Sequence, residues 1–334
     1  MRAMTAATRG QHYIPRLLLR GFSSRRAGDE CYTWMFRRAT KPFETNIVNV
    51  GKERDFHGDP RTSTLEGVIA ERESRYARLV ASLREGIIDD LELLVEFVGS
   101  LALRTKNTRE QLARMGASAV DYSEKFLTTP AGKRHLECEL LEQVVNEPAV
   151  RRALMMLPPR QRKLMKRMIT AKIRSGDWQN QSGGFFQALR TQVDIPAIVV
   201  NAQRKALLQD GAPPARVQSL RSFNWSVVIV SEPLILGDIA AIAFTASLGY
   251  HSAARLEEDT NAVLLPVASH ALVIGTRAHR AFALPATAEI NAASAEVSTE
   301  FFVSHVADDR AVALQTLIGT KPIFTEEEMD TTFS

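Results

Sequence analysis

The spacing of hydrophobic residues changes twice along this chain. Before Gly51, short segments favour β-strands, because residues 31–36 are rich in aromatic side chains and residues 46–50 alternate between apolar and polar. Short runs of aromatic and β-branched residues bounded by turn residues are typical of hairpins. The N-terminal part of the chain therefore predicts a β-element.

From Thr64 onward, apolar residues recur every three or four positions, which predicts a helix that ends at Gly86. A buried helix is expected at residues 91–103, which follow Asp89 and Asp90 and are apolar on nearly every side. Prolines and paired glycines separate further helical segments, at residues 118–127, 132–145, 160–174 and 184–192. The middle of the chain is therefore expected to be helical.

Beyond Pro213 and Pro214, β-branched runs return and predict strands at residues 225–230, 234–236, 263–267 and 271–275. A last helix is expected at residues 286–305, with Phe301 and Phe302 in its core, before a frayed acidic tail at residues 321–334. The predicted class is α+β, in which N- and C-terminal segments form one mostly antiparallel sheet. We expect a single domain over residues 1–320, with a helical insertion at about residues 64–210.

The composition excludes a membrane span. The chain has 334 residues, of which 45% are hydrophobic and 24% are charged, close to the averages of globular domains. No apolar run approaches the roughly 20 residues that a membrane-spanning helix needs. The apolar run at residues 17–19 is too short for a secretory signal. These features predict a soluble, cytoplasmic protein.

Positive charge gathers in one segment. Between Arg151 and Arg174 there are nine Lys or Arg residues and no Asp or Glu, whereas acidic residues dominate beyond Ala281. Apolar residues alternate with the basic ones, so the segment predicts a basic amphipathic helix. The residues expected to contact nucleic acid are Arg160, Lys163, Lys166 and Arg167.

Other partners are compatible with this helix. Trp178, Phe185 and Phe186 follow it and can stack on bases. An anionic membrane face or an acidic protein would also attract it. A solvent-facing helix, or one covered by the acidic C-terminal region, explains the same pattern because long Lys and Arg side chains cover apolar surface.

The segment HYIPRLLLRGF at residues 12–22 resembles the opening of a bacterial family known as domain of unknown function 4238. Segments throughout the chain resemble the same family: residues 51–56, Glu66, Glu73, Arg104, Thr105, Trp225, Gly237, Asp238, Leu265, Pro266 and Asn291. The resemblance therefore covers nearly the whole chain. It implies a shared fold and a shared site, and it supplies no activity.

Some of these residues can carry chemistry. His12 can act as a general base or metal ligand, or can simply pack or cap. Glu66 and Glu73 are seven residues apart, so both lie on one flank of the predicted helix. They can bind a divalent cation, Mg²⁺ or Mn²⁺, with Asp238 as the third ligand. Ion pairs explain the same pattern without chemistry, and the candidate partners are Arg72, Arg104 and Arg109.

Motifs of several enzyme classes are absent from the sequence, namely GxxxxGK[ST], GxGxxG after a strand, GxSxG and HExxH. The leading hypothesis is a metal-assisted phosphodiesterase or nuclease-like enzyme in a bacterial defence or mobile-element context. In this hypothesis His12 is base or ligand, and Arg20 or Arg104 holds a phosphate. The alternative is a non-catalytic nucleic-acid or protein interaction module, in which the His, Glu and Arg residues form a structural network.

Overall fold

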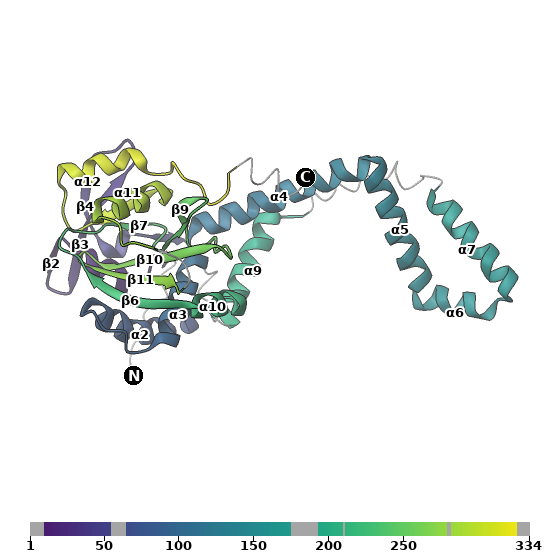
Figure 1. Ribbon diagram of the computed structural model, residues 1–334, viewed down its shortest axis with the longest axis horizontal. Coiled ribbons are helices and arrows are strands. Elements are labelled where there is room, and N and C mark those ends of the chain that lie inside the picture. The colour runs from purple at the N-terminus through teal and green to yellow at the C-terminus, as the bar shows by residue number, and fades with distance from the viewer. Residues whose placement is uncertain (1–9, 55–64, 175–192, 210, 279–281, 326–334) are drawn as a thin grey trace. The chain divides into compact units, whose positions relative to one another are not determined.

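The computed structural model describes residues 10–54, 65–174, 193–209, 211–278 and 282–325 (Figure 1). They form two compact units. The described residues of 10–111 and 199–325 make up the first unit, and those of 112–198 make up the second. The chain combines helices with antiparallel strands, which confirms the predicted α+β class.

The strands of the described residues lie in the first unit and form three antiparallel sheets. The smallest sheet pairs β1 (Gly10–His12) with β5 (Lys52–Arg54). The strand expected at residues 46–50 is instead a 3-10 turn, η2 (Ile47–Asn49). The Asn46 side chain caps this turn by accepting a hydrogen bond from the Val48 N–H at 3.0 Å, so local side-chain bonding outweighs the alternating pattern.

A five-stranded sheet contains the meander and has the strand order β6-β11-β10-β8-β9. Its strands are β6 (Phe223–Ile229), β8 (Ile242–Thr245), β9 (Gly249–Ser252), β10 (Thr260–Ala268) and β11 (Ala271–Arg277). β10 and β11 are buried along most of their length. Strands covered on both faces are nearly continuous apolar runs, and for this reason the sequence predicted β10 and β11 well.

The other five-stranded sheet joins the two ends of the chain. Its strands are β2 (Arg25–Ala27), β3 (Glu30–Arg37), β4 (Phe43–Asn46), β7 (Leu236–Gly237) and β12 (Phe301–Ser304). Phe302 of β12 lies opposite Phe36 of β3, and their rings stack with centroids 4.8 Å apart. The predicted pairing of N- and C-terminal segments is therefore confirmed, and the meander forms its own sheet instead of extending this one.

The last predicted helix is too long. α11 spans Thr287–Val297 and ends at Ser298, whose backbone is extended. Phe301 and Phe302 are fully buried, but they lie in β12 and not in a helix. A run of four strand residues is too short to reveal its period, and no proline marks the end of α11 in the sequence.

Helices lie on opposite sides of the sheets of the first unit, with α11 and α12 (Asp309–Leu314) above and α2 (Leu65–Arg84) and α3 (Leu91–Leu103) below them in Figure 1. They are α1 (Arg16–Leu19), η1 (Arg20–Phe22), α2, α3, α10 (Pro214–Arg221), α11, α12 and η3 (Gln315–Leu317). α4 (Lys106–Thr128) begins in this unit, and α9 (Ile195–Gln209) ends in it. Leu18 and Phe22 from the opening motif are fully buried, so this motif supplies core side chains.

The second unit is helical. It contains the rest of α4, α5 (Pro130–Asn146), α6 (Pro148–Met156), α7 (Pro159–Arg174) and the start of α9. Proline is the first residue of α5, α6 and α7, where its missing N–H would have no partner in the helix anyway. The helix predicted at residues 184–192 lies outside the described residues, as do Trp178, Phe185 and Phe186. The single-domain organisation of residues 1–320 stays a prediction.

Candidate functional site

Arg104 connects three segments of the first unit. It caps the C-terminus of α3, and only 4% of its side chain is exposed. Its Nη2 atom donates to Glu73 Oε1 of α2 at 2.7 Å and to the His12 carbonyl of β1 at 3.1 Å. Hydrogen bonds that join two charged groups are stronger than neutral ones. The structure thus brings together three residues that the sequence nominated.

Glu73 is engaged by Arg104 and is 29% exposed on its side chain. Its neighbour Arg72 turns elsewhere, because it lies 3.9 Å from Glu96 and donates to the Leu207 carbonyl. Of the candidate ion-pair partners, Arg104 contacts Glu73. The side chain of Glu66, the other carboxylate of the predicted pair, lies outside the described residues.

The imidazole ring of His12 is held by a hydrogen bond to a backbone carbonyl. Nδ1 donates to the Val50 carbonyl at 3.0 Å, because a carbonyl oxygen can only accept. Burial lowers the pKa of His12, and the Arg16 charge acts in the same direction, while the Val50 bond and Glu73 oppose them. The ring is therefore biased toward the neutral tautomer with Nε2 as an acceptor, a form that can take up a proton.

Asp238 follows β7 and organises the turn before β12. Its Oδ1 accepts the Thr299 N–H at 2.8 Å, and its Oδ2 accepts the Glu300 N–H at 2.6 Å. Burial raises the pKa of Asp238 to about 6, although the two backbone bonds favour the charged form. Both oxygens are thus committed to holding the chain in position.

A small polar cavity of about 10 Å³ lies next to Asp238. Its lining includes Tyr13 and Thr105, the residues that directly follow His12 and Arg104 in the chain. Two residues that line the cavity beside Asp238 are therefore sequence neighbours of residues in the Arg104 network. The hydrogen bonds described above join the Asp238 side chain to other residues, in the turn before β12. A cavity of this size holds about one water molecule and leaves no room for a substrate.

The remaining site residue of the first unit, Arg20, is not part of either group. It is exposed at η1. Burial is the main cause that lowers the pKa of the half-buried Arg84, and the charge of Arg20 acts in the same direction. Within the described ranges, no group of three or more His, Cys, Asp or Glu side chains is arranged to hold a metal ion. The described contacts of Arg104 link it to Glu73 and to the His12 carbonyl.

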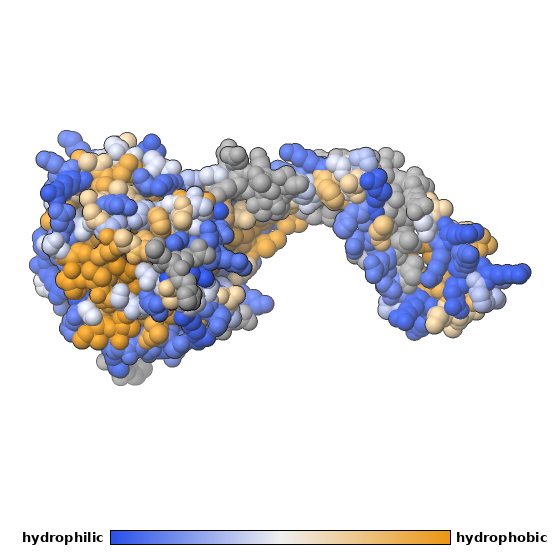
Figure 2. Space-filling model, in the orientation of Figure 1, coloured by the Kyte–Doolittle hydropathy of each residue, from blue (hydrophilic) through white to orange (hydrophobic). Residues whose placement is uncertain are grey.

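The basic segment forms a hollow of about 830 Å³ along α7 in the second unit. Its charged lining residues are Arg162, Lys163, Lys166 and Arg167, and Pro159, Thr170 and Ala171 complete it. Among the residues that the structure describes, the lining contains no carboxylate. In Figure 2 the face of this helix that is turned to the viewer carries mostly hydrophilic residues.

Three of the predicted contact residues line this hollow, namely Lys163, Lys166 and Arg167. The fourth, Arg160, is exposed on the same helix and does not line it. Arg162 does line it and was not nominated. Arg162 Nε also donates to the Leu154 carbonyl at 3.0 Å, which fixes the turn between α6 and α7.

A family model described as "Protein of unknown function (DUF4238)" matches residues 10–301. This chain belongs to the DUF4238 family. No curated protein matches it, and neither does any solved structure. The match begins at β1, includes the whole second unit and ends in β12.

Several of the residues that resemble the DUF4238 family form hydrogen bonds that stabilise the fold of this protein. Besides the Arg104 network, Asn291 of α11 clamps the loop before β7. Its Nδ2 donates to the Pro233 carbonyl at 2.8 Å, and its Oδ1 accepts the Ile235 N–H at 3.0 Å. Arg104, Asp238 and Asn291 therefore hold loops and distant segments of the chain together.

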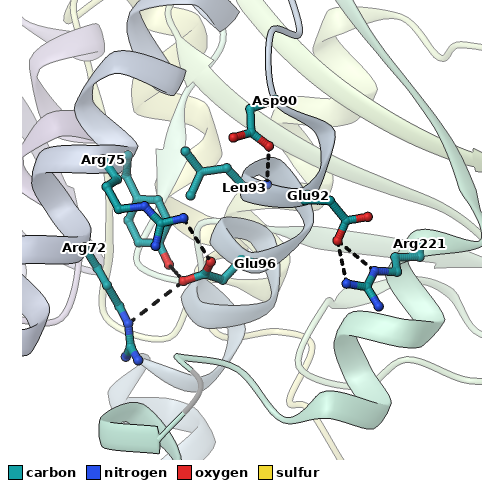
Figure 3. Close-up of polar contacts among 8 residues, drawn as sticks. Arg72, Arg75, Asp90, Glu92, Leu93, Glu96 and Arg221 are labelled. Carbon is teal, nitrogen blue, oxygen red and sulfur yellow. Dashed lines mark hydrogen bonds and ion pairs between the residues drawn. The ribbon is translucent and has the colours of Figure 1, made fainter.

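The sequence did not reveal a polar hollow of about 330 Å³ between α2, α3 and α10 of this DUF4238 protein. Four of its five described charged lining residues pair with one another or with nearby side chains, whereas Asp90 accepts the Leu93 N–H at 2.9 Å (Figure 3). Glu96 accepts the Tyr76 hydroxyl at 2.9 Å and lies 3.8 Å from Arg75. Glu92 accepts two bonds from Arg221, at 2.5 and 2.9 Å. Four of the five charged side chains that line the hollow therefore already have a partner.

Proposed function

We propose that this DUF4238 protein is a non-catalytic module that binds nucleic acid through the α7 hollow. The observation that carries the proposal is a hollow whose described lining has four basic side chains and no carboxylate. Lys and Arg side chains that neutralise phosphates supply most of the sequence-independent affinity for nucleic acid.

The charges of the hollow are available to a ligand. Lys163, Lys166 and Arg167 form no ion pair with any residue that the structure describes. Arg162 is anchored through its bonds to backbone carbonyls, so its charge is held in place. Lysine carries its charge on a flexible stem, so two lysines beside a fixed arginine suit a phosphate backbone, which requires charge more than a particular geometry.

The first unit supports the non-catalytic part of the proposal. Glu73 is engaged by Arg104, and both oxygens of Asp238 accept backbone N–H groups. These contacts give both carboxylates a role in holding the first unit together, as the structural-network alternative requires.

The test is binding of a labelled oligonucleotide by the full chain, followed by fluorescence anisotropy over a range of salt concentrations. We compare wild type with Lys163→Ala/Lys166→Ala/Arg167→Ala. The triple variant should bind more weakly, and its salt slope should be smaller by about 3, or about 1 for each lost phosphate contact.

The matched control is Arg38→Ala/Lys41→Ala/Lys205→Ala, which removes the same charge from exposed positions of the first unit. Equal weakening by both triples would show that net charge alone drives binding and would contradict the α7 site. Tighter binding to anionic lipid vesicles than to DNA or RNA would replace nucleic acid with a membrane surface. Mg²⁺- or Mn²⁺-dependent cleavage that is lost in Glu73→Gln would contradict the non-catalytic part.

A further inference from the structure

A pocket of about 490 Å³ lies in the first unit, far in sequence from α7. It is bounded by α11, α12, the loop before β7 and the residues that follow β12. Ligand pockets in proteins usually measure about 300–1,000 Å³. This pocket therefore has the size of a small-molecule site.

The interior of the pocket is apolar. Ile235 and Ala311 line it and belong to a small buried core that also contains Phe302. Ala288 of α11 and Ala313 of α12 line its walls. Because alanine side chains are short, the two helices leave space between them that larger residues would fill.

Hydrogen bonds hold the walls in place. Asn291 fixes the loop at Pro233 and Ile235, as described above. Asp308 caps α12, because its Oδ1 accepts the Ala311 N–H at 2.8 Å. Ser304 Oγ accepts the Val306 N–H at 3.2 Å. A pocket whose walls are fixed loses little conformational entropy when it binds a ligand.

The rim of the pocket carries an excess of negative charge. Among the described lining residues, Glu232 and Asp308 supply two carboxylates and Arg310 supplies one guanidinium. Arg310 lies 3.3 Å from Glu232, and both side chains are more than half exposed. Exposed pairs of this kind are weak, so a ligand cation can displace Arg310 from Glu232 at little cost.

We infer that this pocket binds a small molecule with an apolar body and a positively charged nitrogen. The body lies against Ile235 and Ala311, and the nitrogen lies at the rim beside Asp308 and Glu232. This site is independent of nucleic-acid binding by α7, and either can fail without the other.

The probes are phenethylamine and hydrocinnamate, which share an aromatic body and carry opposite charges. Binding to the full chain is measured by saturation-transfer NMR titration. A probe of this size should bind with a dissociation constant on the order of 1 mM. The amine should bind more tightly than the carboxylate.

Three variants locate the site. Ala313→Trp fills the pocket from an exposed wall position and should abolish binding, whereas Val312→Trp, at an exposed neighbour that does not line it, should leave binding unchanged. Asp308→Asn keeps the helix cap, because asparagine caps as well as aspartate, and should weaken amine binding about threefold.

No saturable binding of phenethylamine would overturn the inference. The same holds for equal affinity of the two probes, or for amine binding that persists in Ala313→Trp.

Discussion

The guanidinium of Arg104 lies 2.7 Å from the carboxylate of Glu73, across 31 residues of sequence. Arg104 is almost completely buried, and its Nε atom has no hydrogen-bond partner among the described residues. The compensation of its charge therefore depends on Glu73 and on the His12 carbonyl. A buried charge that loses its partner destabilises a protein strongly.

Glu73→Ala should therefore lower the free energy of unfolding. We expect a loss of about 2–3 kcal/mol, below the roughly 3–5 kcal/mol of fully buried pairs, because Glu73 is 29% exposed. Urea denaturation measures the change. Glu71→Ala, on the exposed side of the same helix, is the control and should stay within about 0.5 kcal/mol of wild type.

Thermal melts with Mg²⁺ or Mn²⁺ extend this comparison. A metal that raises the melting temperature of wild type but not of Glu73→Ala would mean that the Glu73 carboxylate binds a cation. The ion pair with Arg104 would then not be its only role.

Local signals in the sequence were enough to predict the helices around this network. The apolar spacing predicted α2 (Leu65–Arg84), and Gly86 follows its end with a positive φ of 85°. α3 begins after Asp90, whose side chain accepts the Leu93 N–H at 2.9 Å. Apolar periodicity and caps act over a few residues, so a single sequence displays them.

The sequence reduced the ion pair of Glu73 to a few candidate arginines but did not identify Arg104 as the partner. The ion-pair interpretation named Arg72, Arg104 and Arg109 as alternatives for the glutamates, and the choice among them depends on how α2, α3 and β1 pack. The turn held by Asp238 was missed for a similar reason. Its contacts with Thr299 and Glu300 span 61 and 62 residues, and no local pattern encodes them.

Asp238 should make the protein less stable as pH rises, the opposite of the effect of a carboxylate in an ion pair. Burial raises its pKa to about 6 from an ordinary 3.8, so between these values the folded state binds more protons than the unfolded state. The stabilisation from this group is fully present below the ordinary pKa and is lost as pH rises through about 6.

We expect the stability of wild type relative to Asp238→Asn to fall by roughly 1–3 kcal/mol from about pH 4 to pH 7, because a tenfold change in proton affinity corresponds to about 1.4 kcal/mol. Urea denaturation of both proteins at several pH values measures the difference, and groups common to both cancel. A difference that stays constant would mean that burial does not raise this pKa.

Gly21 of the opening motif should tolerate no side chain. A Cβ there would overlap the Val267 carbonyl oxygen and would lie 2.9 Å from the Ala268 Cα. Gly21→Ala should therefore cost about 1–3 kcal/mol, as overpacking does. Gly67→Ala is the matched control, because nothing lies within 4 Å of its Cβ position in α2, and it should add about 0.5–1 kcal/mol. Similar denaturation midpoints for the two variants would rule out close packing at Gly21.

Arg216 of α10 contrasts with Arg104. Its Nη1 donates to the Ala254 carbonyl at 2.9 Å, while its Nε has no partner among the described residues. Burial alone lowers the pKa of Arg216 to about 10, with no carboxylate to oppose it. A buried charge of this kind favours unfolding, and methionine fills similar space without charge.

Arg216→Met should therefore change the free energy of unfolding by between zero and a gain of about 1 kcal/mol, because the lost Ala254 bond offsets part of the benefit. Arg104→Met should lose about 2–4 kcal/mol, since it leaves the Glu73 carboxylate without its cation. Denaturation of both variants in the same buffer tests the contrast. A comparable loss in Arg216→Met would mean that the Arg216 charge is compensated in solution, since an uncompensated buried cation cannot stabilise the fold.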